Sequence, residues 1–173
     1  MKPSRRTSNS ESNKVKKVAI FVDVQNIYYT TKQAYQCHFD YRAFWSVATS
    51  DRQVVAAFAY AINRGNEKQI QFQQILKEIG FDVKLKPYIQ RSDGSTKGDW
   101  DVGITLDIIE MAPVVDVVVL ASGDGDFDLA LERIHKNYQV DTEVFGVPSL
   151  TATSLVAATK KFVPIDQSLL LRR

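Results

Sequence analysis

The segment VDVVVLASGDGDFD, residues 115–128, joins an almost wholly apolar run to a turn that is rich in aspartate and glycine. A strand that is apolar on both faces is typical of a parallel sheet that helices cover on both sides. The segment therefore predicts a central parallel strand over Val115–Ala121, with acidic side chains at its carboxyl end.

The rest of the chain alternates short β-rich runs with helical patterns, which is the rhythm of βαβ units and of an α/β fold. Further strands are expected at Val18–Val22, Val54–Ala61, 81–89, Thr142–Val147 and Phe162–Ile165. Helices are expected at 24–36, around Phe44–Ala48, and at Gln69–Ile79, Asp99–Met111, Phe127–Tyr138 and Leu150–Thr159. Pro87 has no N–H to donate, so the third strand is expected at an edge of the sheet. The polar residues 91–98 are expected to form a loop.

Length and composition are those of a single globular domain. The 173 residues are 45% hydrophobic and 24% charged, which is close to average usage. One cysteine, Cys37, and two histidines exclude an internal disulfide and a cysteine-rich zinc site, and favour the reducing cytoplasm. No apolar run approaches the ~20 residues of a membrane span, so no membrane partner is expected.

Positive charge is concentrated at the start of the chain. Residues 1–17 hold six Lys and Arg against one Glu, a net charge of +5, which leaves 16 against 19, or −3, for the remainder. Residues 1–14 show no hydrophobic periodicity and too little apolar surface to offset the entropy of ordering. We therefore predict a disordered basic leader over residues 1–16 and one domain over residues 17–173.

Two acidic strand ends are expected to meet in the sheet. If the first three strands wind in one direction and the fourth starts in the other, the ends of strands one and four lie side by side. Asp23 and Asp124 would then be about 4.8 Å apart, a separation at which two carboxylates can share a divalent cation. The alternative is that each aspartate only caps the helix that follows it.

Other aspartates are candidates for the same cluster. Asp126 follows Asp124 closely, whereas Asp128 could equally be a first-turn acid that the helix dipole favours. Asp99 is expected to cap its helix, which leaves Asp101 free to point into the cluster. Asp107 lies about 120° round the helix from Asp101, so its alternative is a hydrogen-bonding role within the protein.

The sequence matches the motifs of nucleotide-binding loops poorly. Gly123-Asp-Gly125 opens like a dinucleotide fingerprint, but Asp128 stands where the third glycine belongs. A Gly-x-x-x-x-Gly-Lys-Ser/Thr loop is absent from the sequence.

Three motifs, in this order and spacing, carry a resemblance to a known family. They are Phe21-Val-Asp-x-x-Asn26-Ile, Lys97-Gly-x-x-Asp101-Val and Ser122-Gly-Asp-Gly-Asp126-Phe. Together they resemble the NYN domains, specifically the LabA-like branch of the PIN-like nuclease superfamily. The resemblance covers about residues 17–165. It implies a PIN-like three-layer α/β/α sandwich with a mostly parallel central sheet.

The resemblance also implies an acidic pocket that binds Mg²⁺ or Mn²⁺ and serves RNA cleavage. Its acidic positions match Asp23, Asp101, Asp124 and Asp126, and its polar positions match Asn26 and Ser122. The second motif is one residue longer than the usual Lys-Gly-x-Asp-Val, so either Asp99 or Asp101 could be the ligand. Asp101 is preferred because the following valine and the helical register match the family.

Roles for the remaining candidates follow from their chemistry. Asn26 could orient a water or a phosphate oxygen, or only help to cap a helix, and Ser122 could form a hydrogen bond with Asp124. Arg64, Arg91 and Lys97 could form cationic walls for a polymer, or only a solvated surface.

The aromatic residues between positions 28 and 45 bear on which partners the chain binds. Tyr28 is a candidate for stacking on a base, although most aromatic residues between positions 28 and 45 are expected in the core or in an interface. The expected partner is single-stranded RNA, and a second copy of the chain is a further candidate.

Two other functions fit the same pocket. A binding or regulatory module could retain the acidic residues and contact RNA or a protein without cleaving. A small phosphatase-like or sugar-phosphate enzyme would use the same metal chemistry. Cleavage of RNA, DNA and a chromogenic phosphate ester distinguishes these functions.

The basic leader is expected to add nonspecific affinity for nucleic acid. Each phosphate neutralised on a single strand contributes about −0.7 to the slope of log K against log salt. Deleting residues 1–14, which carry a net charge of +3, should therefore flatten that slope by up to about 2 and leave saturated turnover little changed. Titrations of the full chain and the truncated chain at three salt concentrations measure this. Parallel plots of log K against log salt for the two chains would mean that the leader does not touch the nucleic acid.

Overall fold

An all-parallel sheet forms the middle of the molecule. The computed structural model describes residues 14–87, 89–90, 96–97 and 99–172. Six strands lie in the order β3-β2-β1-β6-β7-β8, and each hydrogen-bonded pair is parallel. The strands are β1 Lys16–Asp23, β2 Arg52–Asn63, β3 Asp82–Pro87, β6 Val117–Ala121, β7 Asp141–Gly146 and β8 Lys161–Pro164. A separate antiparallel pair joins β4 Ile89–Gln90 to β5 Thr96–Lys97.

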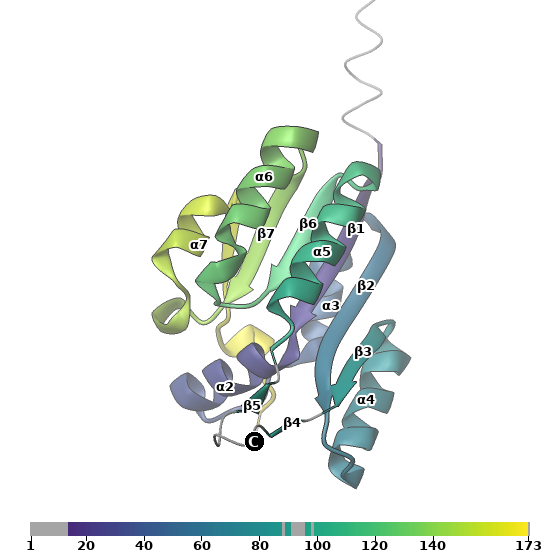
Figure 1. Ribbon diagram of the computed structural model, residues 1–173, viewed down its shortest axis with the longest axis vertical. Coiled ribbons are helices and arrows are strands. Elements are labelled where there is room, and N and C mark those ends of the chain that lie inside the picture. The colour runs from purple at the N-terminus through teal and green to yellow at the C-terminus, as the bar shows by residue number, and fades with distance from the viewer. Residues whose placement is uncertain (1–13, 88, 91–95, 98, 173) are drawn as a thin grey trace, which may run out of the picture.

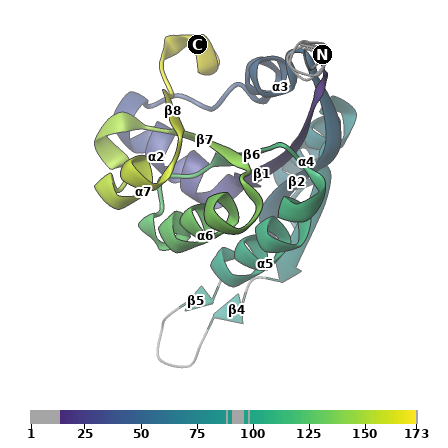
Figure 2. The same ribbon diagram turned by 90° about the horizontal axis from the view of Figure 1, so that it is seen from above.

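Helices cover both faces of this sheet, as Figures 1 and 2 show. One face carries α2 Val24–Tyr35, α3 Tyr41–Thr49 and α4 Glu67–Ile79, and the other carries α5 Asp101–Met111, α6 Asp128–Tyr138 and α7 Thr153–Ala158. Short 3₁₀ turns lie at Ala112–Val114, Gly125–Phe127, Pro148–Leu150 and Gln167–Leu169. The predicted three-layer α/β/α sandwich is therefore confirmed.

Two hydrophobic cores form because neighbouring side chains of a strand point to opposite faces. In β1, Ile20 packs into the core under α2 and α3, while Phe21 packs into the core under α5 and α6. Both side chains are fully buried, and burying such a side chain stabilises the fold by about 1.5–3 kcal/mol. Along the described residues, no helix is long and apolar enough to cross a lipid bilayer.

The topology matches the expected switch point. β1 lies between β2 and β6, so the chain winds outward from β1 in both directions. β3, which ends at Pro87, lies at the edge as predicted. The carboxyl ends of β1 and β6 therefore lie side by side, with Val22 opposite Ala121.

Several boundaries differ from the sequence expectation. The helix expected from Asp99 begins at Asp101. Its N-cap residue is Trp100, which makes no side-chain capping bond. Part of the expected loop is the strand β5, while residues 91–95 and 98 fall outside the described residues. The helix expected from Leu150 begins at Thr153, because Pro148–Leu150 forms its own 3₁₀ turn. Most of the expected leader, residues 1–13, also falls outside the described residues.

Candidate functional site

Three elements bring acidic side chains to one end of the sheet. β1 ends at Asp23, and the turn after β6 carries Asp124 and Asp126. Asp101 is the first residue of α5, which packs against β1 and against the 3₁₀ turn that begins at Gly125. Asp23 and Asp124, which are 101 residues apart in the sequence, therefore meet because β1 and β6 are neighbours.

Asp101, Asp124 and Asp126 form a compact group, which we call the acidic group. One carboxylate oxygen from each lies within 4.8 Å of the others. Asp101 and Asp124 are half-buried, while Asp126 is exposed. Carboxylate oxygens at this spacing are the ligands that hard divalent cations such as Mg²⁺ prefer. The donor set therefore fits such an ion.

The crowding of carboxylates changes the protonation of Asp101. Burial, the hydrogen bond with Asp124, and repulsion from Asp124, Asp99 and Asp23 together raise the pKa of Asp101 to about 7. A carboxyl group that keeps its proton can donate a hydrogen bond to a neighbouring carboxylate. A protonated Asp101 can therefore donate a hydrogen bond to Asp124.

Asp23 lies beneath the acidic group and is not one of its three members. It is only 8% exposed, and it accepts hydrogen bonds from the Asn26 backbone N–H at 3.3 Å and from Ser122 Oγ at 3.2 Å. Burial, above all, raises the pKa of Asp23 to about 6, with repulsion from Asp124 and Asp99 adding to it. The same side chain caps α2, so the capping role and the proximity to the acidic residues occur together.

Neutral polar groups tie the two strand ends together. Ser122 Oγ accepts a hydrogen bond from the Asp124 backbone N–H at 3.2 Å while it donates to Asp23. Asn26 Oδ1 accepts a hydrogen bond from the Gly123 backbone N–H at 2.9 Å. A Cβ atom at Gly123 would lie 2.7 Å from the Leu150 carbonyl oxygen, so only glycine fits this turn without a backbone shift.

The fold and this geometry agree with the comparison against known families. The family described as NYN domain matches residues 17–166. The chain belongs to the NYN domain family. It is 27% identical over 158 residues to the low amplitude and bright protein LabA of Synechococcus elongatus, covering 87% of this chain and 84% of that protein.

A solved structure supports the same architecture for this NYN domain. A protein of unknown function from Vibrio parahaemolyticus is 57% identical, with a TM-score of 0.87. The match covers 91% of this chain and 97% of that one. A ribokinase of Giardia lamblia aligns at 13% identity with a TM-score of only 0.42, and that likeness carries no argument about function.

Three other aspartates of the NYN domain do not belong to the acidic group. Asp107 Oδ2 accepts a hydrogen bond from Tyr60 Oη at 2.7 Å and pairs with Lys84 Nζ at 2.7 Å. Asp99 is exposed, and its Oδ1 accepts from the Asp101 backbone N–H at 3.4 Å. Asp128 Oδ1 accepts from the Leu129 backbone N–H at 2.6 Å. Of the two aspartates in the longer second motif, Asp101 is the one that joins the acidic group.

The structure describes the candidate substrate-binding cations to different extents. Arg64 lies in an exposed segment directly after β2, and Lys97 lies in β5, where only the backbone is described. Arg91 falls outside the described residues. Sequence reasoning missed Lys86, whose Nζ donates to the Asp99 carbonyl oxygen at 3.4 Å and lies 4.4 Å from the Trp100 ring centroid. The two-residue spacing of Lys84 and Lys86 in a strand was a signal that one face of β3 is basic.

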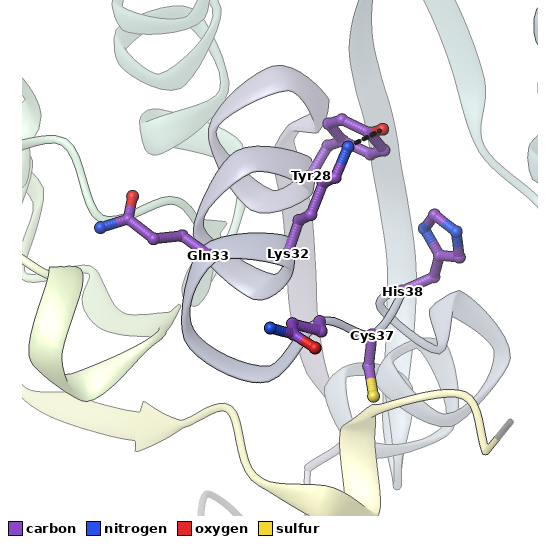
Figure 3. A pocket seen from close by; sticks show the side chains of 6 residues that line it. Tyr28, Lys32, Gln33, Cys37 and His38 are labelled. Atoms are coloured by element: carbon purple, nitrogen blue, oxygen red, sulfur yellow. Dashed lines mark hydrogen bonds between the residues drawn. The ribbon is translucent and has the colours of Figure 1, made fainter.

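Tyr28 lies on α2 and is 41% exposed. It lines an open hollow of about 650 Å³ together with Lys32, Gln33, Gln36, Cys37 and His38. Figure 3 shows Lys32 reaching along the helix to the Tyr28 hydroxyl, with the His38 ring on the same side. The ring centroids of Tyr28 and His38 are 5.9 Å apart. This hollow includes none of the three residues of the acidic group.

Replacing Asp23 by asparagine should stabilise the cation-free protein at neutral pH. The folded-state pKa of Asp23, about 6, lies above the ordinary value of 3.8. The contribution of the Asp23 proton to the free energy of unfolding is therefore fully present below pH 4. It is lost as the pH rises through 6. Asp23→Asn should therefore raise the free energy of unfolding at pH 7.5 by up to about 3 kcal/mol, and by little at pH 4. Urea denaturation at the two pH values measures this.

The matched control is Asp40→Asn, since Asp40 caps α3 through the Ala43 backbone N–H and asparagine caps helices equally well. Asp23→Asn should also reduce the rise in melting temperature that Mn²⁺ causes, because the charge of Asp23 acts on Asp101. A variant that is destabilised at pH 7.5, with an undiminished Mn²⁺ response, would limit Asp23 to the capping role.

The affinity for Mn²⁺ should depend on pH through Asp101. A cation must displace the proton of Asp101, whose pKa is about 7. Mn²⁺ affinity should therefore fall by about tenfold for each pH unit below 7 and level off above it. Isothermal titration calorimetry from pH 5.5 to 8.5 tests this, with Asp101→Asn as the comparison that should lose the dependence between pH 6 and 7, above the pKa of Asp23. Equal affinities at pH 5.5 and 7.5 would contradict it.

Proposed function

We propose that this NYN domain is a divalent-cation-dependent ribonuclease that hydrolyses single-stranded RNA. The observation that carries the proposal is the acidic group, in which oxygens of Asp101, Asp124 and Asp126 lie within 4.8 Å of one another at the carboxyl end of the sheet. Ligands of open α/β sheets bind at this kind of switch point. Membership of the NYN domain family supports the nuclease class.

Asp101, Asp124 and Asp126 would hold Mg²⁺ or Mn²⁺, with Asp23 adding negative charge beneath them. When bound, such an ion supplies an activated water and stabilises the charge that develops on phosphate oxygens. The raised pKa of Asp101 favours an exchange of its proton for a cation. The exposed position of Asp126 leaves this side of the group open to a polymer.

Neighbouring residues would position the substrate. Asn26 commits Oδ1 to the Gly123 backbone N–H, so its Nδ2 is the end that can donate to a phosphate oxygen. Ser122 would keep Asp23 and Asp124 in place through its two hydrogen bonds. Lys86 brings a positive charge next to Asp99, close to the start of α5, where it can offset the repulsion between the acidic group and a phosphate backbone.

Loss of one carboxylate should abolish cleavage and leave the fold intact. Asparagine at position 124 can still accept from the Asp126 backbone N–H, as Asp124 does at 3.0 Å, so Asp124→Asn should fold normally. Loss of a residue that only supports a metal ligand costs about 10- to 100-fold, so the loss of a direct ligand should slow RNA cleavage by more than about 100-fold. EDTA should abolish wild-type activity, and Mn²⁺ should restore it.

Asp141→Asn is the matched control, because Asp141 starts β7 at the opposite end of the sheet and pairs with Lys160. It should cleave like the wild type. Both variants and the wild type are assayed on mixed single-stranded RNA, single-stranded DNA and a chromogenic phosphate ester. Binding of RNA without cleavage would favour a non-cleaving module, and cleavage of the ester alone would favour a phosphatase. Equal activity of Asp124→Asn and wild type would contradict the proposed site.

A further inference from the structure

Three aromatic rings lie in contact on the surface of α2 and of the segment that follows it. Tyr28 and Tyr29 are 41% and 51% exposed, and their ring centroids are 5.4 Å apart in an edge-to-face arrangement. The exposed His38 ring stacks on Tyr28, with the two centroids 5.9 Å apart. These rings give the surface flat apolar area of the kind on which other rings stack.

The backbone holds the Tyr28–His38 pair in place. Gln36 ends α2 in the left-handed conformation, with a φ of 53°, and the turn brings His38 back alongside Tyr28. The His38 carbonyl oxygen then accepts a hydrogen bond from the Leu171 backbone N–H at 2.8 Å. The segment that carries the His38 ring is therefore fixed to the end of the chain before any ligand binds.

Lys32 places a positive charge at the rim of the Tyr28 ring. The two residues are four positions apart on α2 and so share a face of the helix, and Lys32 Nζ donates a hydrogen bond to Tyr28 Oη at 3.4 Å. Figure 3 shows both side chains and the His38 ring on the same side of α2. Lys32 forms no ion pair with any residue that the structure describes. Residues 24–39 also contain no Asp or Glu, so this positive charge is not offset locally.

The hollow beside these side chains has the size and the chemistry of a nucleotide site. Its volume of about 650 Å³ lies within the range of about 300–1,000 Å³ that is typical of sites for small ligands. Its lining supplies two rings, two side-chain amides, a thiol and one ammonium group, and no carboxylate. Proteins bind single-stranded nucleic acid by stacking bases on aromatic rings and by pairing phosphates with cations. An apolar peptide or a free carboxylic acid would use only one of these two features.

We propose that Tyr28, His38 and Lys32 form a nucleotide subsite for single-stranded RNA. A base stacks on the Tyr28–His38 pair, and Lys32 Nζ binds a phosphate of the same strand. The proposal rests on the proposed function for its assumption that this strand is the one that the acidic group cleaves.

Helix α2 connects the subsite to the acidic group. The helix begins directly after Asp23, and Tyr28 lies only about 8 Å further along the helix axis. Tyr29 lies about 60° round the helix from Asn26, which holds the Gly123 turn through its side chain. A strand whose phosphate lies at the acidic group can therefore pass Tyr29 and reach the Tyr28 ring.

Binding is measured apart from cleavage, with the Asp124→Asn variant as the parent and the fluorescence anisotropy of a short labelled single-stranded RNA. Tyr28→Ala should raise the dissociation constant at least about fivefold, which is the lower end of the effect of losing one base stack. Tyr28→Phe keeps the ring and should bind like the parent. Lys32→Gln should flatten the slope of log K against log salt by about 0.7, the contribution of one phosphate contact.

Two matched controls lie elsewhere on the surface. Tyr138, the last residue of α6, is 43% exposed, and Lys77 lies in the last turn of α4 as Lys32 does in α2. Tyr138→Ala and Lys77→Gln should bind RNA like the parent. Circular dichroism melting checks that each variant is folded, and Tyr28→Leu, which lacks a flat ring but keeps apolar bulk, replaces Tyr28→Ala if the latter does not fold.

Two further probes separate the base from the phosphate and the strand from a free nucleotide. An abasic strand of the same length should bind Tyr28→Ala as well as it binds the parent, and should still respond to Lys32→Gln. A mononucleotide should bind the parent more weakly than the RNA does. If Tyr28→Ala weakens the mononucleotide and leaves the RNA unaffected, the hollow is a site for a free nucleotide and the proposal is overturned.

Other results would also overturn the subsite. They are a parent that does not bind RNA, a Tyr28→Ala variant that binds RNA as tightly as the parent, an equal loss in Tyr138→Ala, and an equal loss for the abasic strand. Failure of the proposed function gives a different result. The wild type would then bind RNA with an affinity that depends on Tyr28 and would not cleave it.

Discussion

The pairing of β1 with β6 is the contact on which the site depends. The two strands are parallel neighbours with Val22 opposite Ala121, so Asp23 and Ser122, the next residue on each strand, meet at the same end of the sheet. The connection between the strands contains two further strands of the sheet and four helices. A bulge that shifts the register between Val18 and Ala19 of β1 affects the β2 side and leaves the β6 side regular. The regular pairing holds Asp23 next to Ser122.

Carboxylates at this junction oppose one another. Burial and mutual repulsion raise the pKa of both Asp23 and Asp101, so the folded protein retains protons near neutral pH that free carboxyl groups would release. Backbone N–H groups and the Ser122 hydroxyl offset part of this cost by donating to Asp23 and Asp124. The remaining cost means that any ligand which brings positive charge to this end should stabilise the fold as well as bind to it.

Much of the fold followed from patterns in the sequence. The apolar run before Ser122 indicated a strand buried on both faces, and β6 is wholly buried. Pro87 indicated an edge strand, and β3 is one. The rule for right-handed crossovers then predicted that the ends of the first and fourth strands meet. These features are local, or follow from general rules of chain topology.

Side-chain partners from distant segments were much harder to predict. The ion pair of Asp107 with Lys84 joins α5 to β3, and neither residue has a local pattern that indicates the other. The start of α5 was misplaced by two residues because Asp99 is a good capping residue by type, whereas the chain places Trp100 at that position. Trp100 instead donates Nε1–H to the Ala61 carbonyl oxygen at 2.9 Å and packs against Tyr60. This long-range anchoring outweighs a local capping preference.

The same anchoring determines where the acidic group forms. Trp100 fixes the start of α5 against the end of β2, and the bond from Tyr60 Oη to Asp107 fixes the helix again two turns later. With α5 held at both points, the half-buried Asp101 at its first turn lies next to Asp124. Asp107 therefore anchors α5 to β2 and β3 through Tyr60 and Lys84, although it does not belong to the acidic group. The site thus depends on β1 and β6 for one pair of acidic strand ends, and on β2 and β3 for the orientation of the helix that completes it.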